Sequence, residues 1–447
     1  MPYTHTTFKD AKTYLSQLLS DTAKTRYTDT ELGHCIVEAI RTWGGMARYF
    51  KDQSYFYTVR PQEFYDLTYE PNFLSSLGYN VKDQDLIRLM LYHLIESVDE
   101  TTSPWSWSGT AMFNLTDMVN ALQRRRDQFL LETACRLTLT SISSAYPIDG
   151  RYTLPDNIID VRRASFTDPI EGKTYLSRED EWSLNALCRS WRTTPTTPRM
   201  PRVYSISSTP KLTIQIGPYP GQAGSLDLIT INTGALLNPS LGVVLGIPDD
   251  FSWVVKWGAL ADLLNMESPA HDSFRADYCE KRWQNGIEWA KIASSFITAQ
   301  FDGLPIGTQS VFDADAFMRG WQNIMGQPRS ILYAGMNILG IFQVPDMDGY
   351  TVTLDFYCNA PVPTADGDFI QVGREELNVI LGYAQHIVSF KEGGDEFKRT
   401  LPLYERFVRM ANLHRRRIDA NAIFPDEMSD RALMEMQRRP MATAAQQ

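Results

Sequence analysis

This sequence has few of the residue patterns that carry chemistry. Its six histidines and five cysteines are dispersed, and no Cys-x-x-Cys or His-x-x-x-His pair offers the spacing of metal ligands. The glycines form neither a phosphate-binding loop nor a dinucleotide fingerprint, and Gly-x-Ser-x-Gly is absent. His271-Asp272 comes nearest to a catalytic pair, but adjacent residues on a loop are weak support for one. We therefore predict no catalytic site, no cofactor and no metal.

The sequence also lacks a membrane span and a secretory signal. Residues 1–5 have no basic and apolar signal architecture, and no apolar run approaches the length of a bilayer. The separated cysteines are typical of free thiols in a reducing cytoplasm. A net charge of −10 argues against a general nucleic-acid binder, which needs a phosphate-neutralising surface. We expect a soluble protein made in the cytoplasm, long enough at 447 residues for two or three domains.

What the sequence does contain is a strand pattern that occurs twice. Residues 203–231 follow Trp191 and alternate apolar and polar side chains around a turn rich in proline and glycine. Residues 330–357 follow Trp321 and repeat the order: Pro-Arg, a strand, a Pro/Gly turn, and a strand containing Leu-Asp. We interpret each stretch as a β-meander and the pair as a tandem duplication.

A pair of predicted helices follows each meander. Residues 247–283 and 372–407 each read as a helix, an acidic loop and a second helix. The predicted fold class is therefore α+β, with an N-terminal helical region followed by two tandem-duplicated β-meander modules, each packed by helices. The expected divisions are a mostly helical region at 1–110, a helix-plus-meander module at 111–300, a second module at 301–420, and a C-terminal helix with a flexible tail at 421–447.

Apolar residues at helical spacing predict further helices outside the meanders. These are expected at 6–24, 28–49, 83–98 and 114–140. Two polar segments, 101–109 and 301–311, are expected to be linkers.

The first module has a motif order that can be compared with known families. In chain order it reads Tyr152-Thr153-Leu154-Pro155-Asp156, Arg162-Arg163, Trp191, Pro201-Arg202-x-Tyr204, Gly217-Pro218-Tyr219-Pro220, Leu226-Asp227-Leu228 and Ile247-Pro248-Asp249-Asp250. This order resembles the head-to-tail adaptor, or connector, proteins of tailed bacteriophages. The resemblance covers mainly 112–290, with a weaker echo at 321–410. The chain departs from the family in its greater length and in lacking the glycine before the first Pro-Arg.

The resemblance implies a structural virion protein of the neck or collar without enzymatic activity. Members of the family form a dodecameric ring under the portal, with helices against the portal and β-structure toward the tail or fibres. The implied partners are further copies of the chain, the portal protein, tail or fibre proteins, and genomic DNA that passes without specific binding, with no membrane. An acidic channel wall suits such passage, because phosphate binding needs the opposite charge.

Arginine clusters and paired tryptophans are the candidate interface residues. They are Arg124, Arg125, Arg126, Arg162, Arg163, Trp105, Trp107, Arg415, Arg416 and Arg417. The arginines fit phosphate contacts but fit a solvated helix face or ion pairs between subunits better, and most tryptophans fit core or interface anchors. Three alternatives to a neck adaptor stay open: another tail, baseplate or fibre-anchoring collar ring, a carbohydrate- or receptor-binding module, and an enzyme with an unrecognised site.

Overall fold

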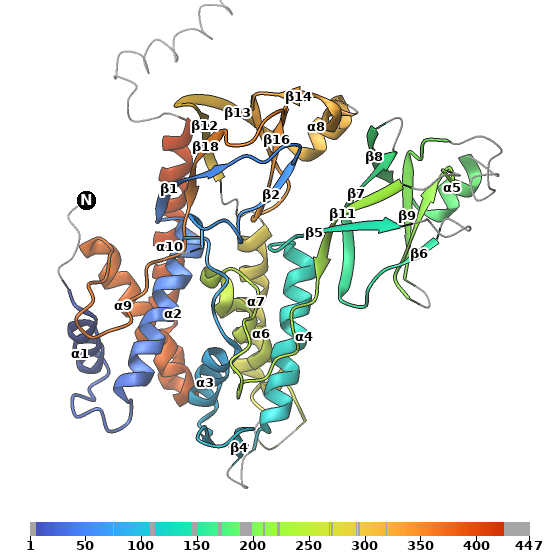
Figure 1. Ribbon diagram of the computed structural model, residues 1–447. Helices are drawn as coiled ribbons and strands as arrows, with labels where there is room; N and C mark the ends of the chain where they lie inside the picture. Colours follow the sequence, from blue (N-terminus) through green and yellow to red (C-terminus); the bar gives the residue numbers. More distant parts are fainter. Residues whose placement is uncertain are drawn as a thin grey trace, which may run out of the picture. The chain divides into compact units, whose positions relative to one another are not determined.

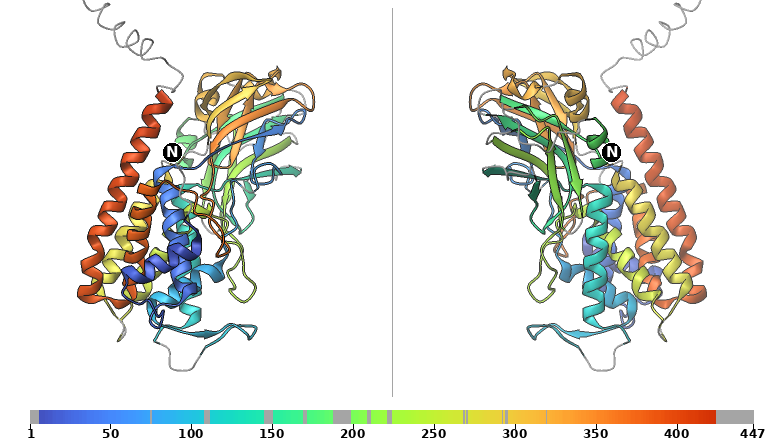
Figure 2. Two further views of the ribbon diagram at one scale, coloured as in Figure 1. Left: turned by 90° about the vertical axis from the view of Figure 1, so that its left-hand side faces the viewer. Right: turned by 90° about the vertical axis from the view of Figure 1, so that its right-hand side faces the viewer.

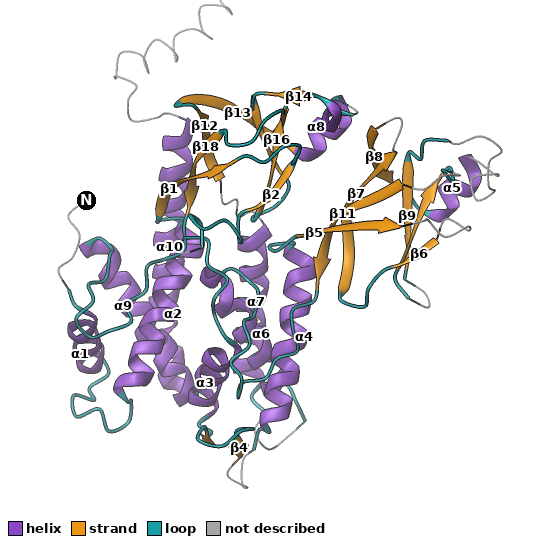
Figure 3. Ribbon diagram, in the orientation of Figure 1, coloured by secondary structure: helices purple, strands orange, loops and turns teal. Residues whose placement is uncertain are grey.

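The fold of the chain is α+β, as predicted. The computed structural model describes residues 6–74, 76–107, 112–144, 151–168, 172–187, 199–208, 211–220, 224–267, 269, 271–291, 293, 296–318 and 320–423 (Figure 1). The chain divides into two compact units, Met1–Phe50 with Ala360–Gln447, and Lys51–Asn359. The first unit is helical in its described part, and the second holds both helices and sheets (Figure 3).

The first unit joins helices from the two ends of the chain. They are α1 (Phe8–Leu18), α2 (Asp29–Ala47), α9 (Arg374–Ser389) and α10 (Gly394–Ile423), with a short 3₁₀ turn η3 (Phe390–Glu392) between the last two. Threonines cap the first two helices, because their hydroxyls accept hydrogen bonds from free backbone N–H groups. Trp43 of α2 packs edge-on against Phe407 and His414 of α10. The Lys391 ammonium lies 2.8 Å from a carboxylate oxygen of Glu31, which ties the C-terminal helices to α2.

The helices of the second unit pack at close range. They are α3 (Asp83–Leu94), α4 (Leu115–Thr133), α6 (Ser252–Leu264), which follows the 3₁₀ turn η1 (Asp249–Phe251), and α7 (Ser273–Lys291). Helices α4, α6 and α7 lie side by side (Figure 2). A Cβ at Gly286 would lie 2.4 Å from Val254, and one at Gly258 would lie 2.6 Å from Trp283. Glycine at these two positions therefore lets α6 and α7 approach each other closely.

One sheet of the second unit comes from a continuous stretch, and we call it the inner sheet. Its strands are β5 (Thr138–Ser144), β6 (Arg151–Thr153), β7 (Ile158–Asp168), β8 (Gly172–Arg178), β9 (Val203–Ser207), β10 (Thr213–Gly217) and β11 (Gly224–Asn232), in the order β5-β11-β7-β8-β9-β10-β6. Only β8 and β9 pair in parallel, and the short helix α5 (Glu181–Leu187) lies between them in the chain. Val161, Ala164, Phe166 and Leu226 are fully buried on its core face.

The other sheet comes from residues on both sides of the inner sheet in the sequence, and we call it the outer sheet. Its strands are β1 (Lys51–Tyr57), β2 (Phe64–Asp66), β12 (Phe296–Phe301), β13 (Leu304–Ser310), β15 (Ser330–Tyr333), β16 (Ile338–Phe342) and β18 (Thr351–Tyr357), in the order β1-β18-β12-β13-β15-β16-β2. Only β13 and β15 pair in parallel, and α8 (Val311–Phe317) and the 3₁₀ turn η2 (Trp321–Asn323) lie between them in the chain. Two further pairs are β3 (Val98–Asp99) with β4 (Ser106–Trp107), and β14 (Met325–Gly326) with β17 (Val344–Pro345).

The strands of the two sheets follow the same chain order from edge to edge. We number the seven strands of each sheet from 1 to 7 in chain order. From one edge to the other, both sheets then have the order 1-7-3-4-5-6-2. Both meanders predicted from the sequence lie within these sheets, as β9-β10-β11 and as β15-β16 with β18. In the sheet order, however, the last strand of each predicted meander is separated from the other two.

Most predicted helices are confirmed, but two segments correct the sequence interpretation. The helix predicted at 114–140 ends at Thr133, because Ala134 adopts a left-handed conformation and a strand begins at Thr138. The alternation of Thr138, Leu139 and Thr140 favours a strand and outweighs the apolar residue at 137 that extended the helical pattern. The predicted linker at 301–311 is wrong, since β13 and the turn that precedes it occupy this segment. Its strand reads as polar because most of its side chains are exposed.

Candidate interaction surfaces

Two histidines and two cysteines of the described residues lie in buried or half-buried surroundings. No group of three histidine, cysteine or acidic side chains that could hold a metal ion occurs among the described residues. Nε2 of His93 lies 3.0 Å from the buried Lys256 ammonium, and Nδ1 of His386 lies 2.7 Å from the Thr400 hydroxyl. Burial raises the pKa of Cys135 to about 12 and that of the half-buried Cys358 to about 11. Both thiols are therefore protonated and unreactive near neutral pH.

The arginines of α4 have three different environments. Arg124 is exposed and pairs with Asp262 of α6 at 2.6 Å, whereas Arg125 pairs with the same carboxylate and with Glu280 of α7. Burial opposes ionisation of Asp262, but hydrogen bonds and charge from these two arginines outweigh it and lower the pKa of that carboxyl. Arg126 is fully buried and donates to Asp127 and to the Ala235 carbonyl oxygen. Of the three, only Arg124 presents much of its side chain to a partner.

The two arginines of β7 also separate into a surface residue and a core residue. Arg162 is exposed, lies 3.7 Å from Asp160, and donates to the Leu131 carbonyl oxygen. Arg163 is 3% exposed and makes two hydrogen bonds, of 2.8 and 2.9 Å, with the carboxylate of Asp315. The register of β7 against β11 shifts at this point, so Arg163 pairs with Ile229 and Val161 with Thr230, while Arg162 is the extra residue between them. Arg163 is therefore an internal cation rather than a surface group.

The remaining candidates are also unequal in exposure. Trp105 is 8% exposed, and its ring lies under the Arg88 guanidinium at 5.5 Å. It is thus packed within its own unit and is not presented for stacking on a sugar. On α10, Arg415 is half-buried and Arg416 is exposed. The side chains of Trp107 and Arg417 lie outside the described part of the chain, as do the predicted anchor Trp191 and the C-terminal tail from residue 424.

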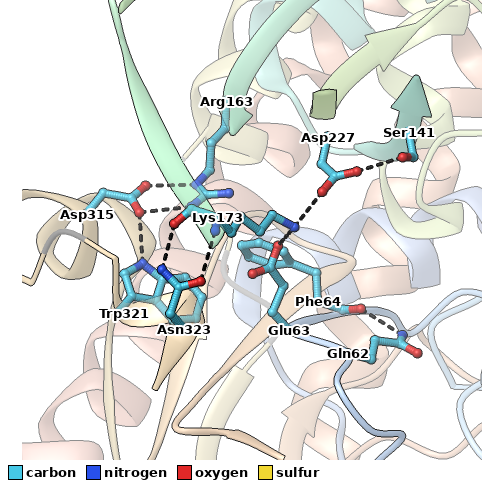
Figure 4. Close-up of polar contacts among 10 residues, drawn as sticks. All are labelled: Gln62, Glu63, Phe64, Ser141, Arg163, Lys173, Asp227, Asp315, Trp321 and Asn323. Carbon is cyan, nitrogen blue, oxygen red and sulfur yellow. Dashed lines mark hydrogen bonds and ion pairs between the residues drawn. The ribbon is translucent and has the colours of Figure 1, made fainter. Parts of the chain in front are cut away.

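Sequence reasoning did not find the cluster that joins the two sheets. Figure 4 shows Arg163 of β7 against Asp315 of α8, with Trp321 Nε1 donating to the same carboxylate at 2.8 Å. The Arg163 guanidinium also lies over the rings of Phe64, Tyr175 and Trp321 at 5.0–5.9 Å. An arginine with two carboxylate bonds and aromatic walls is well desolvated and geometrically defined. This pair fixes α8 of the outer sheet against β7 and β8 of the inner sheet.

A second ionic group extends the same junction. The Lys173 ammonium pairs with Glu63 and lies 2.6 Å from Asp227, which accepts a hydrogen bond from Ser141 at 2.7 Å (Figure 4). Burial would raise the pKa of Asp227, but the Lys173 charge and these hydrogen bonds lower it overall. Asn323 exchanges hydrogen bonds of 2.8 and 2.9 Å with the backbone of Lys173. An open pocket of about 270 Å³ lies at the junction, with Glu63, Arg163 and Lys173 in its lining.

Large apolar side chains are exposed on both short crossover helices. Trp182 of α5 is 85% exposed, and Phe312 and Phe317 of α8 are 56% and 85% exposed. Trp182 and Phe312 are each the second residue of a seven-residue helix, and each helix begins beside a side chain that accepts a backbone N–H, Asp180 or Ser310. Exposed aromatics of this size are typical of surfaces that bind other proteins.

Comparison with models of known protein families gives a match. Residues 84–294 match the family model described as SU10 adaptor protein, which is just under half of the chain. No curated protein matches. None of the described helices is long and apolar enough to cross a membrane. The match supports a phage adaptor, a structural class of virion protein, and places the resemblance on α3 through α7 and the inner sheet.

Proposed function

We propose that this protein is a non-enzymatic adaptor of the neck, joining the portal to the tail as a ring of identical copies. The observation that carries the proposal is the family match over 84–294, a region that includes the inner sheet and its helices. Its partners are further copies of the chain, in the dodecamer that the resemblance implies, the portal protein, and tail or fibre proteins. The exposed aromatics on α5 and α8 supply apolar surface for such contacts.

DNA passes through the ring without specific binding in this proposal. The net charge of −10 supports it, since a wall without excess positive charge does not retain phosphates. Several arginines that the sequence offered for phosphate contacts are neutralised within the chain: Arg125 and Arg163 by carboxylates on other elements, and Arg126 by the adjacent Asp127. A channel wall that maps as strongly basic in an assembled particle would contradict this part of the proposal.

We also infer that the chain contains two copies of one module, nested rather than consecutive. The inner module is 82–291, and the outer module is 6–66 together with 296–423. The shared strand order supports this division, as do two equivalent bridges, Thr7 with Phe369 and Lys82 with Val244. Each bridge joins the residue before the module's first helix to the segment before its fourth helix, α6 or α9. These boundaries replace the consecutive modules expected from the sequence.

Electron microscopy of intact particles that carry a C-terminal tag on this chain tests its location. We expect the label as a ring at the head–tail junction. Label at the distal tail, baseplate or fibres would favour the alternative of another ring or collar protein. Particles without label would contradict a virion role.

A further inference from the structure

The contact between the two sheets is made by different parts of the two modules. The outer module contributes its crossover helix α8, and the inner module contributes the hairpin of β7 and β8, where Arg163 meets Asp315 (Figure 4). If the modules are two copies of one fold, this contact is heterologous. One copy uses its crossover helix, and the other uses its hairpin. The helix of the inner module and the hairpin of the outer module are left without this contact.

The register of the strands shows which residues are equivalent. In the inner sheet Leu228 pairs with Ala164, and Ala164 with Leu176. In the outer sheet Leu354 pairs with Ala299, and Ala299 with Ile306. The next residue of each fourth strand begins the parallel pairing with the fifth strand. Ser177, after Leu176, pairs with Val203, and Gly307, after Ile306, pairs with Ser330. Arg163 therefore corresponds to Thr298, and Asp315, the fifth residue of α8, corresponds to Asn185, the fifth residue of α5.

The surfaces equivalent to the internal contact are exposed in the described structure. On the outer hairpin, Thr298 and Pro305 are exposed and Leu304 is 69% exposed. On the inner crossover helix, Trp182 is 85% exposed. Both members of the internal ion pair are neutral at the equivalent positions, Asn185 and Thr298. The Thr298 hydroxyl donates to the Asp355 carboxylate, which also accepts a hydrogen bond from Gln53 at 2.8 Å. The carboxylate beside Thr298 is therefore already hydrogen-bonded within the chain, and the neutral Asn185 adds no second charge to the contact.

We propose that the occupant of these surfaces is a second copy of this chain. The α5 helix of one copy binds the β12–β13 hairpin of the next, which repeats between chains the contact that α8 makes with β7–β8 within the chain. A heterologous contact of this kind builds a closed ring or an open filament. Each chain then contributes two modules, one inner and one outer, to the circumference of the assembly. The inference rests on the nested duplication and is independent of where the protein lies in the virion.

Photo-crosslinking of the full-length chain tests this contact. Trp182 is replaced by p-benzoylphenylalanine, and differently isotope-labelled chains are mixed so that crosslinks between chains are distinguished from those within one chain. We expect a ladder extending beyond dimers, with crosslinks from position 182 to residues 298–305 of another chain. The same replacement at Leu236, which is 83% exposed on another loop, is the matched control and should give no ladder. Monomers at every concentration, a product that stops at dimers, or crosslinks elsewhere would each overturn the proposal.

A charge-pair exchange gives a second, quantitative test. Asn185→Asp with Thr298→Arg copies the internal ion pair into the proposed contact between chains. Asn185→Asp alone brings a second carboxylate toward Asp355 and should weaken assembly, whereas Thr298→Arg alone can pair with Asp355 of its own chain and is the background for the double variant. Assembly is measured by mass photometry over a concentration series. We expect the double variant to associate roughly tenfold more tightly than the two single effects predict together, as for close charge pairs in interfaces. Additive effects would contradict the contact, and circular dichroism of each variant confirms that it is folded. Failure of these tests leaves the microscopy prediction for the head–tail junction intact.

Discussion

The variant Asp315→Asn tests how strongly the two sheets are held together. It removes the only carboxylate that the Arg163 guanidinium contacts among the described ion pairs, although that arginine is 3% exposed. Leaving a buried charge without its partner costs about 3–5 kcal/mol. Because about 1.4 kcal/mol is a factor of ten in an equilibrium constant, local opening of the junction should increase by about two to three and a half powers of ten.

Hydrogen exchange of the full chain is the assay, because unfolding of a chain with several units is not expected to be two-state. Faster exchange should be confined to α8, η2, β7 and β8. The double variant Arg163→Met/Asp315→Leu should restore most of the protection, since it removes both charges and keeps apolar volume. Arg124→Ala is the matched control, because that arginine is exposed and its ion pair contributes less than about 1 kcal/mol. If Asp315→Asn changed exchange no more than the control, the junction would not depend on this pair.

Three further predictions concern packing, pH and thiols. Gly286→Ala should destabilise the second unit by about 1–3 kcal/mol, because its Cβ would overlap Val254. Gly382→Ala is the control and should be neutral or stabilising, because its Cβ would meet only Leu403 at 3.7 Å. Thermal unfolding combined with hydrogen exchange of individual segments measures both effects. The pKa of Asp262 is lowered in the folded chain, so its carboxylate stabilises the fold above the usual carboxyl pKa, and this stabilisation is lost as the pH falls through the lowered pKa. Asp262→Asn should therefore make the free energy of unfolding depend less on pH at acidic pH. Buried Cys135, with a pKa of about 12, should resist iodoacetamide at pH 8 until the chain is unfolded, as read by peptide mass spectrometry.

Individual helices and strands could be predicted from the sequence, because the spacing of apolar residues depends on local structure. Helix α2 lies within two residues of its predicted limits at both ends, and the alternation predicted within 203–231 corresponds to β9, β10 and β11. The departures have physical causes. A left-handed residue at Ala134 ended a helix whose apolar spacing continued, and exposure hid the strand β13.

The order of the strands across each sheet could not be predicted from the sequence. Strand β1, for example, pairs with β18, some three hundred residues later in the chain. Nothing in a period-two pattern states which strand pairs with which. In the nested division that we infer, Leu354 corresponds to Leu228 rather than Leu226, so the repeated Leu-Asp letters lie two residues apart.

The arginines show the same limit for the candidate surfaces. Adjacent charges such as Arg162 and Arg163 look alike in a sequence, but the first is the extra residue of a register shift and is exposed, whereas the second is enclosed by aromatic rings. The partner of the enclosed one, Asp315, lies on a short helix without a sequence motif. The sequence pattern pointed only to the nearby Trp321, which precedes the second predicted meander. Its indole N–H donates to the Asp315 carboxylate.

The position of β1 and β2 sets an order on the synthesis of this chain. Both strands leave the ribosome before residues 67–295, and their partners β18 and β16 leave it only afterwards. The inner sheet has all of its strands by residue 232 and can close first. During that interval the two early strands have unpaired backbone edges, which are templates for association with other chains. The outer sheet is therefore the late and vulnerable step, and slowing translation between residues 232 and 351 should lower the yield of native chain more than slowing it earlier.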